Sequence, residues 1–212
     1  MGVGAMTLRR AIFLDRDGSI NGMVYNPEFG VVDSPQNADE FQLLPGVPEA
    51  IQMINDMDFL AVVVSNQPGI AKGKYTPAIL EAVTDKMHRQ LAEAGARLDA
   101  VYYCLHHPEA VLEKYRIFCD CRKPKPGLLR RAASQLGIDM RASYMIGDGL
   151  TDVLAGKAAG CTTILLGNHK CEICRMMEEL NAWPDLRAAS LLEAVRIIRE
   201  SLRDRRNTYI RR

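Results

Sequence analysis

The 212-residue sequence lacks an excess of charge of either sign: 27 lysine and arginine residues are balanced by 26 aspartate and glutamate residues. Such a balance gives no support for a surface dedicated to nucleic acid or to an anionic membrane. There is no apolar run long enough to span a bilayer, and residues 1–10 lack the extended apolar stretch of a secretory signal. We therefore expect a cytoplasmic protein with neither a nucleic-acid nor a membrane partner.

The sequence also lacks internal repeats, low-complexity linkers and a break in composition that would mark a second domain. A chain of this length suits one domain with a sizeable core, so we predict a single domain over residues 1–212. A terminal helix and a basic, solvated tail are expected at about 190–212. The sequence favours a monomer, with a dimer as the alternative. In a reducing compartment the six cysteines are expected to be thiols or metal ligands rather than disulfides.

Short apolar runs alternate with segments that have the three-to-four spacing of amphipathic helices. The runs predict strands at 11–14, 59–64, 101–104, 144–146 and 162–166. The amphipathic segments predict helices at 47–56, 77–94, 127–136, 151–159 and 190–203. This alternation predicts an α/β fold: a Rossmann-like parallel sheet with helices on both faces. Because ligands bind beyond the carboxyl ends of strands in such sheets, the residues that follow each strand are the functional candidates.

Two acids, Asp15 and Asp17, follow the first strand and are separated by a single residue. Carboxylates cannot be buried uncompensated in a core, and Gly18 leaves room for a ligand close to the backbone. A divalent cation with oxygen ligands fits this arrangement and usually also holds a phosphate oxygen. One carboxylate could then attack phosphorus while the other handles a proton. A solvated turn is the alternative interpretation.

Polar groups also occur after the second strand and in the loop before the predicted helix 127–136. Ser65, Asn66 and Gln67 come after the second strand and could donate hydrogen bonds to phosphate oxygens, or could simply form a polar turn that caps the next helix. Arg122 and Lys123 lie in a loop stiffened by prolines, where Lys123 could offset negative charge and Arg122 could bind a second anionic group.

A second pair of acids, Asp148 and Asp152, follows the predicted strand 144–146. Asp148 is the candidate for a direct magnesium ligand. Asp152 falls in the first turn of the next helix, where a carboxylate complements the helix dipole. It is therefore expected either to cap that helix or to support the metal from a second layer.

Three cysteines and one histidine form two close pairs in the segment 104–121: Cys104 with His106, and Cys119 with Cys121. This composition matches a tetrahedral structural zinc site with no open position. The neighbouring His107 is a competing ligand. A loop of this kind cannot form a core alone, so zinc would fold it over the mouth of the site and position Arg122 and Lys123.

A further metal could bind near Cys171 and Cys174, with His169 and Cys161 as additional ligands. A lone Cys-x-x-Cys pair is weak evidence for such a site. Helix-packing thiols or a dimer contact are the simpler interpretations.

Taken in order, the four strand ends supply Asp/Asp, Ser/Asn, Lys and Asp, and this arrangement resembles the haloacid dehalogenase superfamily of phosphohydrolases over residues 11–166. The Cys-x-His and Cys-x-Cys-Arg-Lys-Pro pattern is similar to its histidinol-phosphatase-related subfamily. The resemblance implies a core without a large cap domain and with a short zinc loop. It also implies hydrolysis of a small phosphorylated sugar: a heptose 1,7-bisphosphate in nucleotide-heptose synthesis is the first candidate, and histidinol phosphate is the alternative.

The resemblance further implies a role for each matching residue. Asp15 would be the nucleophile that forms an aspartyl-phosphate, and Asp17 would protonate the leaving oxygen and then activate water. Ser65 and Lys123 would bind the transferring phosphoryl group. Mg²⁺ would be held by Asp15, the backbone carbonyl of Asp17, and Asp148.

Two features depart from the family pattern. Gly149 stands where relatives often carry a lysine or arginine that touches the substrate, and the segment 21–41 is longer than expected. From another functional class, an inactive binding module stabilised by zinc remains an alternative. The intact polar set argues against it, because a binding module does not need five polar groups that converge on one point.

Overall fold

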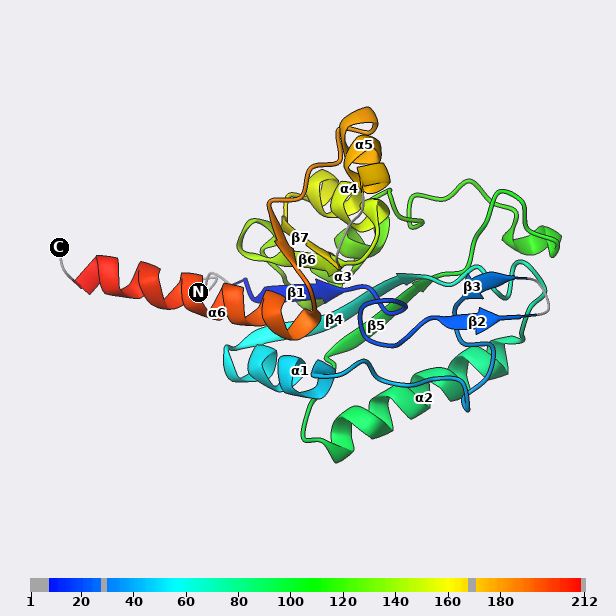
Figure 1. Ribbon diagram of the computed structural model, residues 1–212, viewed down its shortest axis with the longest axis horizontal. Helices are drawn as coiled ribbons and strands as arrows, with labels where there is room; N and C mark the ends of the chain where they lie inside the picture. The colour runs from blue at the N-terminus through cyan, green and yellow to red at the C-terminus, as the bar shows by residue number, and fades with distance from the viewer. Residues whose placement is uncertain (1–7, 28–29, 168–170, 211–212) are drawn as a thin grey trace, which may run out of the picture.

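The computed structural model describes residues 8–27, 30–167 and 171–210. Its centre is a six-stranded parallel sheet with the strand order β5-β4-β1-β6-β7-β8 (Figure 1). The strands are β1 (Arg10–Leu14), β4 (Phe59–Asn66), β5 (Ala100–Cys104), β6 (Tyr144–Gly147), β7 (Thr162–Leu166) and β8 (Leu186–Ala188). The central strand β1 lies between β4 and β6, with Phe13 opposite Val62 on one side and Met145 on the other. The carboxyl ends of these three strands therefore meet at one edge.

Helices cover both faces of the sheet, as the alternating sequence pattern predicts. The helices α1 (Val47–Asp56), α2 (Pro77–Glu93) and α6 (Leu191–Ile210) lie on one side of the sheet, and α3 (Gly127–Leu136) and α4 (Leu150–Ala159) lie on the other (Figure 1). The remaining helix, α5 (Cys171–Glu179), packs beside α4. Two short 3₁₀ turns span Glu113–Tyr115 and Met140–Ala142.

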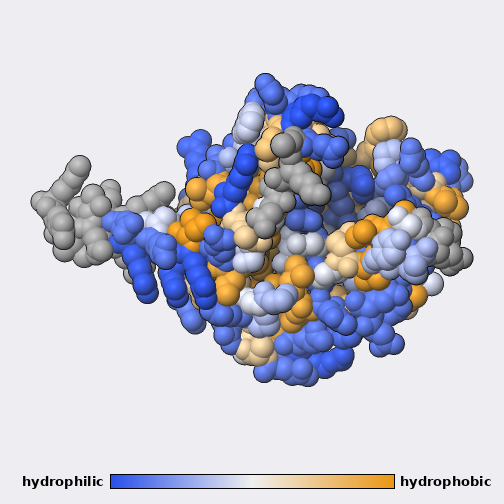
Figure 2. All heavy atoms as spheres, viewed as in Figure 1, coloured by the Kyte–Doolittle hydropathy of each residue, from blue (hydrophilic) through white to orange (hydrophobic). Residues whose placement is uncertain are grey.

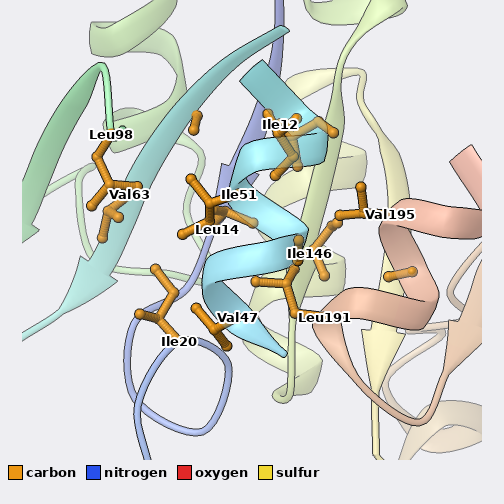
Figure 3. Packing of buried hydrophobic residues seen from close by; sticks show 14 of the residues in the cluster. Ile12, Leu14, Ile20, Val47, Ile51, Val63, Leu98, Ile146, Leu191 and Val195 are labelled. Atoms are coloured by element: carbon orange, nitrogen blue, oxygen red, sulfur yellow. The ribbon is translucent and has the colours of Figure 1, made fainter. Parts of the chain in front are cut away.

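The core divides into two layers because successive strand residues point to opposite faces. Ile12 and Leu14 of β1 pack with the layer that α1 and α6 cover, whereas Ala11 and Phe13 pack with the layer under α3 and α4. Figure 3 shows the first layer, in which Ile51 of α1 lies against Leu14. Burial on both faces holds the central strands in a fixed register, so the residues at their ends have fixed positions.

All five predicted strands are present, and the structure adds three that were not predicted. The strand β8 lies at the edge of the sheet, and β2 (Val24–Asn26) pairs with β3 (Val31–Asp33) in a separate antiparallel ladder. The terminal helix is longer than the predicted 190–203. The added strands are three residues long and only partly buried, which leaves little periodic pattern to detect.

Hydrophilic residues cover the lower edge of the face shown in Figure 2, where α2 lies. Within the described ranges, no helix combines the length and hydrophobicity needed to cross a membrane.

Candidate active site

The carboxyl ends of β4, β1 and β6 bring the predicted polar residues together. The backbone N–H of Asp15 donates to the carbonyl of Ile146 at 3.0 Å, which ties the residue after β1 to β6. Asp148 follows β6 directly, and Ser65 ends the buried part of β4. Residues more than 130 positions apart in the sequence therefore lie at one edge of the sheet.

Lys123 forms the electrostatic centre of this edge. Its Nζ lies 2.9 Å from Asp15 Oδ1 and 2.5 Å from Asp152 Oδ1, and its side chain is 1% exposed. Burial alone would lower the pKa of Lys123, but the two carboxylates outweigh burial and raise it. Asp152 is also fully buried, and burial raises its pKa to about 7 against the attraction of Lys123. Lys123 therefore remains a buried cation held between two acids.

Asp152 has a second function at the start of α4. Its Oδ2 accepts the backbone N–H of Gly149 at 3.1 Å, and the N–H of Asp152 donates to the carbonyl of Gly149 at 3.0 Å. This is a reciprocal cap of the helix N-terminus. The sequence offered two roles for Asp152, a cap of the helix or a support for the metal from a second layer. One side chain that both caps α4 and contacts Lys123 is compatible with both.

Carboxylate oxygens of Asp15, Asp148 and Asp152 lie within 4.8 Å of one another. The Asp148 side chain reaches the surface, yet partial desolvation by the surrounding protein, and then the charge on Asp15, raise its pKa to about 6. Gly18 adopts φ 80°, and a Cβ there would lie 2.1 Å from Asp148 Oδ2. The glycine thus preserves the space that this oxygen occupies. Clustered hard oxygen donors of this kind fit Mg²⁺.

The carboxylate of Asp17 is held by three neighbouring side chains. Asn21 Nδ2 donates to its Oδ1 at 2.9 Å, Gln67 Nε2 donates to its Oδ2 at 2.6 Å, and the guanidinium of Arg16 contacts both oxygens. The Asp17 side chain is 10% exposed. It is therefore fixed in one orientation while still reaching the surface.

The two amides predicted to bind substrate have protein partners. Asn66 Nδ2 donates to the carbonyl of Lys123 and its Oδ1 accepts the Lys123 N–H, both at 3.0 Å. Gln67 Nε2 also contacts Ser65 Oγ at 3.2 Å. Asn66 thus fixes the backbone that carries Lys123. The substrate contacts of Ser65, Asn66 and Gln67 stay predictions.

The predicted zinc ligands converge at the end of β5. Cys121 Sγ lies 3.2 Å from Cys104 Sγ and 3.4 Å from His106 Nδ1, and Cys104 Sγ lies 3.7 Å from Cys119 Sγ. Sulfur atoms that share a tetrahedral zinc ion are separated by about 3.8 Å. Burial, and then the hydrogen bonds that Cys121 donates to the neighbouring sulfurs, raise the pKa of Cys121. The bond from Cys121 lowers the pKa of Cys119 to about 7 despite burial. The chemistry and spacing of these four groups fit zinc.

The structure distinguishes the two histidines of this loop. His106 lies in the cysteine cluster, whereas His107 Nδ1 accepts the backbone N–H of Glu109 at 3.1 Å. The loop also connects to the active site, because Arg122 Nη1 donates to the carbonyl of His106 at 3.2 Å. The cluster and the basic pair are thus one structural unit.

The additional metal site proposed near Cys171 and Cys174 is not tested by the structure. His169 and the Cys171 side chain lie outside the described residues. Cys161 is buried, and burial raises its pKa to about 12, so the thiol stays neutral.

Three residues at the site were not predicted from the sequence: Arg16, Asn21 and Tyr75. The charge of Arg16 suggests a solvated side chain, yet it is 0% exposed. The only sequence signal was its place between two acids. Asn21 and Tyr75 carry no pattern that separates them from ordinary loop residues.

The two departures from the family pattern also have structural correlates. Gly149 is the N-cap of α4, and a Cβ there would lie 3.2 Å from Asp152 Oδ2, so this position is tightly packed. The long segment 21–41 contains the β2–β3 pair, and Lys74 forms an ion pair with Asp33 that ties this pair to the loop after β4.

A parallel sheet with an Asp-x-Asp pair, a buried lysine and further acids at its carboxyl edge defines a phosphoric monoester hydrolase of the haloacid dehalogenase class. A family model described as HAD-hyrolase-like matches residues 120–194. The chain is 42% identical over 186 residues to the D-glycero-beta-D-manno-heptose-1,7-bisphosphate 7-phosphatase of Escherichia coli K12, covering 88% of this chain and 93% of that protein. The Salmonella typhi protein of the same name is 46% identical over 156 residues, covering 74% and 79% of the two chains. The chain belongs to the D-glycero-beta-D-manno-heptose-1,7-bisphosphate 7-phosphatase family.

Solved structures agree with this assignment. The D,D-heptose 1,7-bisphosphate phosphatase from B. bronchiseptica, in complex with magnesium and phosphate, superposes with a TM-score of 0.73 at 31% identity. The match covers 91% of this chain and 99% of that one. The corresponding enzyme from Burkholderia thailandensis has a TM-score of 0.61 at 27% identity, with 90% and 98% covered.

Proposed function

We propose that this protein removes the 7-phosphate of D-glycero-D-manno-heptose 1,7-bisphosphate through an aspartyl-phosphate intermediate, with Mg²⁺ as cofactor. The observation that carries the proposal is the convergence of Asp15, Lys123 and Asp148 at one edge of the sheet. Relatives named for this reaction cover most of the chain and support the choice of substrate.

In the first step, an oxygen of Asp15 attacks phosphorus and forms the new P–O bond as the bond to the sugar oxygen breaks. Asp17 gives its proton to the departing oxygen. In the second step, Asp17 takes a proton from water, which attacks phosphorus and frees the Asp15 carboxylate. The ion pair with Lys123 reduces the repulsion between Asp15 and the phosphate anion.

The proposed magnesium ligands are a carboxylate oxygen from each of Asp15 and Asp148 and the backbone carbonyl of Asp17. When bound, the ion neutralises charge on the phosphoryl oxygens. Ser65 and Lys123, which lie at the same edge, are the proposed contacts to the phosphoryl group, and the contacts with Asn66 fix the backbone of Lys123.

The second proposed metal is a structural zinc bound by Cys104, His106, Cys119 and Cys121. It would hold the loop that leads directly into Arg122, which is the proposed contact to a second anionic group of the substrate. A bisphosphate carries such a group, and the hydrogen bond from Arg122 to His106 connects that contact to the zinc cluster.

The test is phosphate release with Mg²⁺ from heptose 1,7-bisphosphate and from histidinol phosphate, measured side by side. We expect kcat/KM for the heptose ester to be higher by about a hundredfold or more, which is roughly 2.7 kcal/mol of transition-state binding. Phosphorus NMR of the product should show the 1-phosphate retained. Equal and slow turnover of both esters would contradict the heptose assignment, and a complete absence of turnover would support the inactive binding module.

A further inference from the structure

We propose that Arg16 is a positioning residue for the reaction: its buried guanidinium, braced by Gln67 and Tyr75, holds the Asp17 carboxyl so that its proton can pass only toward the substrate oxygen. This inference deepens the proposed function and rests on the role of Asp17 in it.

Arg16 is a full charge with 0% exposure. Removing a guanidinium from water costs several kcal/mol unless close partners compensate for the lost hydration. Its Nη1 has no hydrogen-bond partner among the residues that the structure describes, so part of this cost is not recovered. A placement of this kind is poor for stability alone, which points to a function for the charge.

Asp17 is the main partner of this charge. Nε lies 3.2 Å and Nη2 3.1 Å from Asp17 Oδ1, and Nη2 lies 3.2 Å from Oδ2. A planar donor that reaches both oxygens fixes the orientation of a carboxylate as well as its position. The ring of Tyr103 lies 5.5 Å from the guanidinium carbon and provides a second surface against it.

Gln67 connects Arg16 and Asp17 into a closed network. Its Oε1 accepts Arg16 Nη2 at 2.9 Å, while its Nε2 donates to Asp17 Oδ2 at 2.6 Å. Tyr75 donates its hydroxyl to the same Oε1 at 2.9 Å. Tyr75 is itself fixed by close packing, since a Cβ at Gly69 would lie 2.1 Å from its ring. The orientation of the Gln67 amide is thus determined by its neighbours.

Each of these contacts to the Asp17 carboxylate comes from a donor, namely Arg16, Asn21 or Gln67. A carboxylate can accept all of them, but a protonated carboxyl also needs an acceptor for its O–H. Because Arg16, Asn21 and Gln67 present N–H groups to this carboxyl, the leaving oxygen of the substrate is the acceptor that we assign to its O–H. The network therefore directs the proton toward the reacting bond.

The test compares phenyl phosphate with 4-nitrophenyl phosphate, two esters whose leaving groups differ in their need for a proton. The phenolate leaving group, whose conjugate acid has a pKa of about 10, benefits from protonation as it leaves. The 4-nitrophenolate leaving group departs readily without protonation. We expect Arg16→Lys and Arg16→Met to lower kcat/KM for phenyl phosphate by about 10- to 100-fold and that for 4-nitrophenyl phosphate far less. The ratio kcat/KM includes only the steps up to leaving-group release, so the later hydrolysis of the intermediate does not obscure the comparison.

Three further variants separate positioning from folding. Tyr75→Phe removes one hydroxyl and should produce the same selective loss at smaller size. Arg10→Met is the matched control, because Arg10 stacks on Phe59 at the opposite end of β1, and it should leave the ratio of the two esters unchanged. In an Asp17→Asn background, Arg16→Met should produce no further change in the ratio.

Equal loss on both esters, or a selective loss that persists in the Asp17→Asn background, would overturn the proposal. The proposed function is judged separately with the wild-type protein. If the wild type hydrolyses both aryl esters but not heptose bisphosphate, only the sugar assignment fails and the role of Arg16 is still decided by the ratio. If it hydrolyses no ester, both proposals fall together.

Discussion

Residues at the carboxyl edge of the sheet contribute both to the proposed chemistry and to the stability of the fold. Lys123 pairs with two acids, Asp15 at 2.9 Å and Asp152 at 2.5 Å, and a substitution of Asp15 leaves the Asp152 carboxylate as its partner. The cation therefore keeps one buried partner, and the loss of the other need not unfold the protein. This makes Asp15 a residue whose chemistry can be separated from its contribution to stability.

We expect Asp15→Asn to lower the rate of phosphate release by about a thousandfold or more. The amide keeps the shape of the side chain but is not a nucleophile. The melting temperature should change little. Asp58→Asn is the matched control: Asp58 is exposed, far from the site, and at φ 59°, which asparagine also tolerates. Substantial turnover by Asp15→Asn would remove this residue from the role of nucleophile.

For single residues, the sequence predicted the acids from their places after apolar strands and Lys123 from its proline-stiffened loop. It did not predict Arg16 or the connection of Asn66 to the backbone of Lys123. Both depend on which neighbours a side chain meets in three dimensions, and neither leaves a period or a spacing in the chain.

Among the elements, the loop 104–121 carries the four proposed zinc ligands, so we expect its structure to depend on the metal. We expect His106→Ala and Cys119→Ser to lose the bound zinc, measured as metal content per chain, and to lower kcat/KM on the order of 10- to 100-fold through displacement of Arg122. His107→Ala should retain the metal, because His107 lies outside the cysteine cluster. Zinc lost from His107→Ala and kept in His106→Ala would reverse the ligand assignment.

The start of β8 depends on one carboxylate. Asp185 Oδ2 accepts the N–H of the buried Thr163 at 2.8 Å and its hydroxyl at 2.7 Å. Asp185→Ala leaves both donors unpaired and should lower the free energy of unfolding by about 1–3 kcal/mol. Lys157→Ala, which removes only the exposed ion pair to Asp185, should cost at most about 1 kcal/mol. Chemical denaturation of the three proteins measures the difference.

This contribution should also depend on pH. Burial alone would raise the pKa of Asp185, but the hydrogen bonds from Thr163 outweigh it and lower the pKa in the folded state. Because the pKa of Asp185 is lower in the folded protein, the stabilisation is fully present above the pKa of the unfolded chain, about 3.9. It is lost as the pH falls through the pKa of Asp185 in the folded protein. The difference in stability between wild type and Asp185→Ala should therefore shrink in that acidic range. A difference that stays constant there would exclude the ionised carboxylate as its source.

In the molecule as a whole, α6 closes one face of the core. Val195 and Ile198 are fully buried in the layer that contains α1. We expect Ile198→Ala to cost about 2–5 kcal/mol, roughly 4–20 °C in melting temperature for a chain of this size. Glu200→Ala on the exposed side of the same helix should change stability by no more than about 0.5 kcal/mol. Phosphate release well below the melting temperature should be unchanged in both.

The sequence predicted the whole-molecule architecture well because strands buried on both faces and amphipathic helices alternate regularly along it. The edge strand β8 and the β2–β3 pair escaped prediction because segments of three partly exposed residues show no such alternation. The order of the strands was not predicted, because periodicity cannot distinguish one parallel topology from another.

The direction of β1 has a practical consequence. This strand starts beside α6 and runs toward the catalytic edge, so the start of β1 and the projecting outer end of α6 both lie on the side of the molecule away from that edge (Figure 1). A fusion partner or a solid support attached at either place should leave the substrate path open. Immobilised protein is therefore expected to turn over as fast as protein free in solution, whichever end carries the linker.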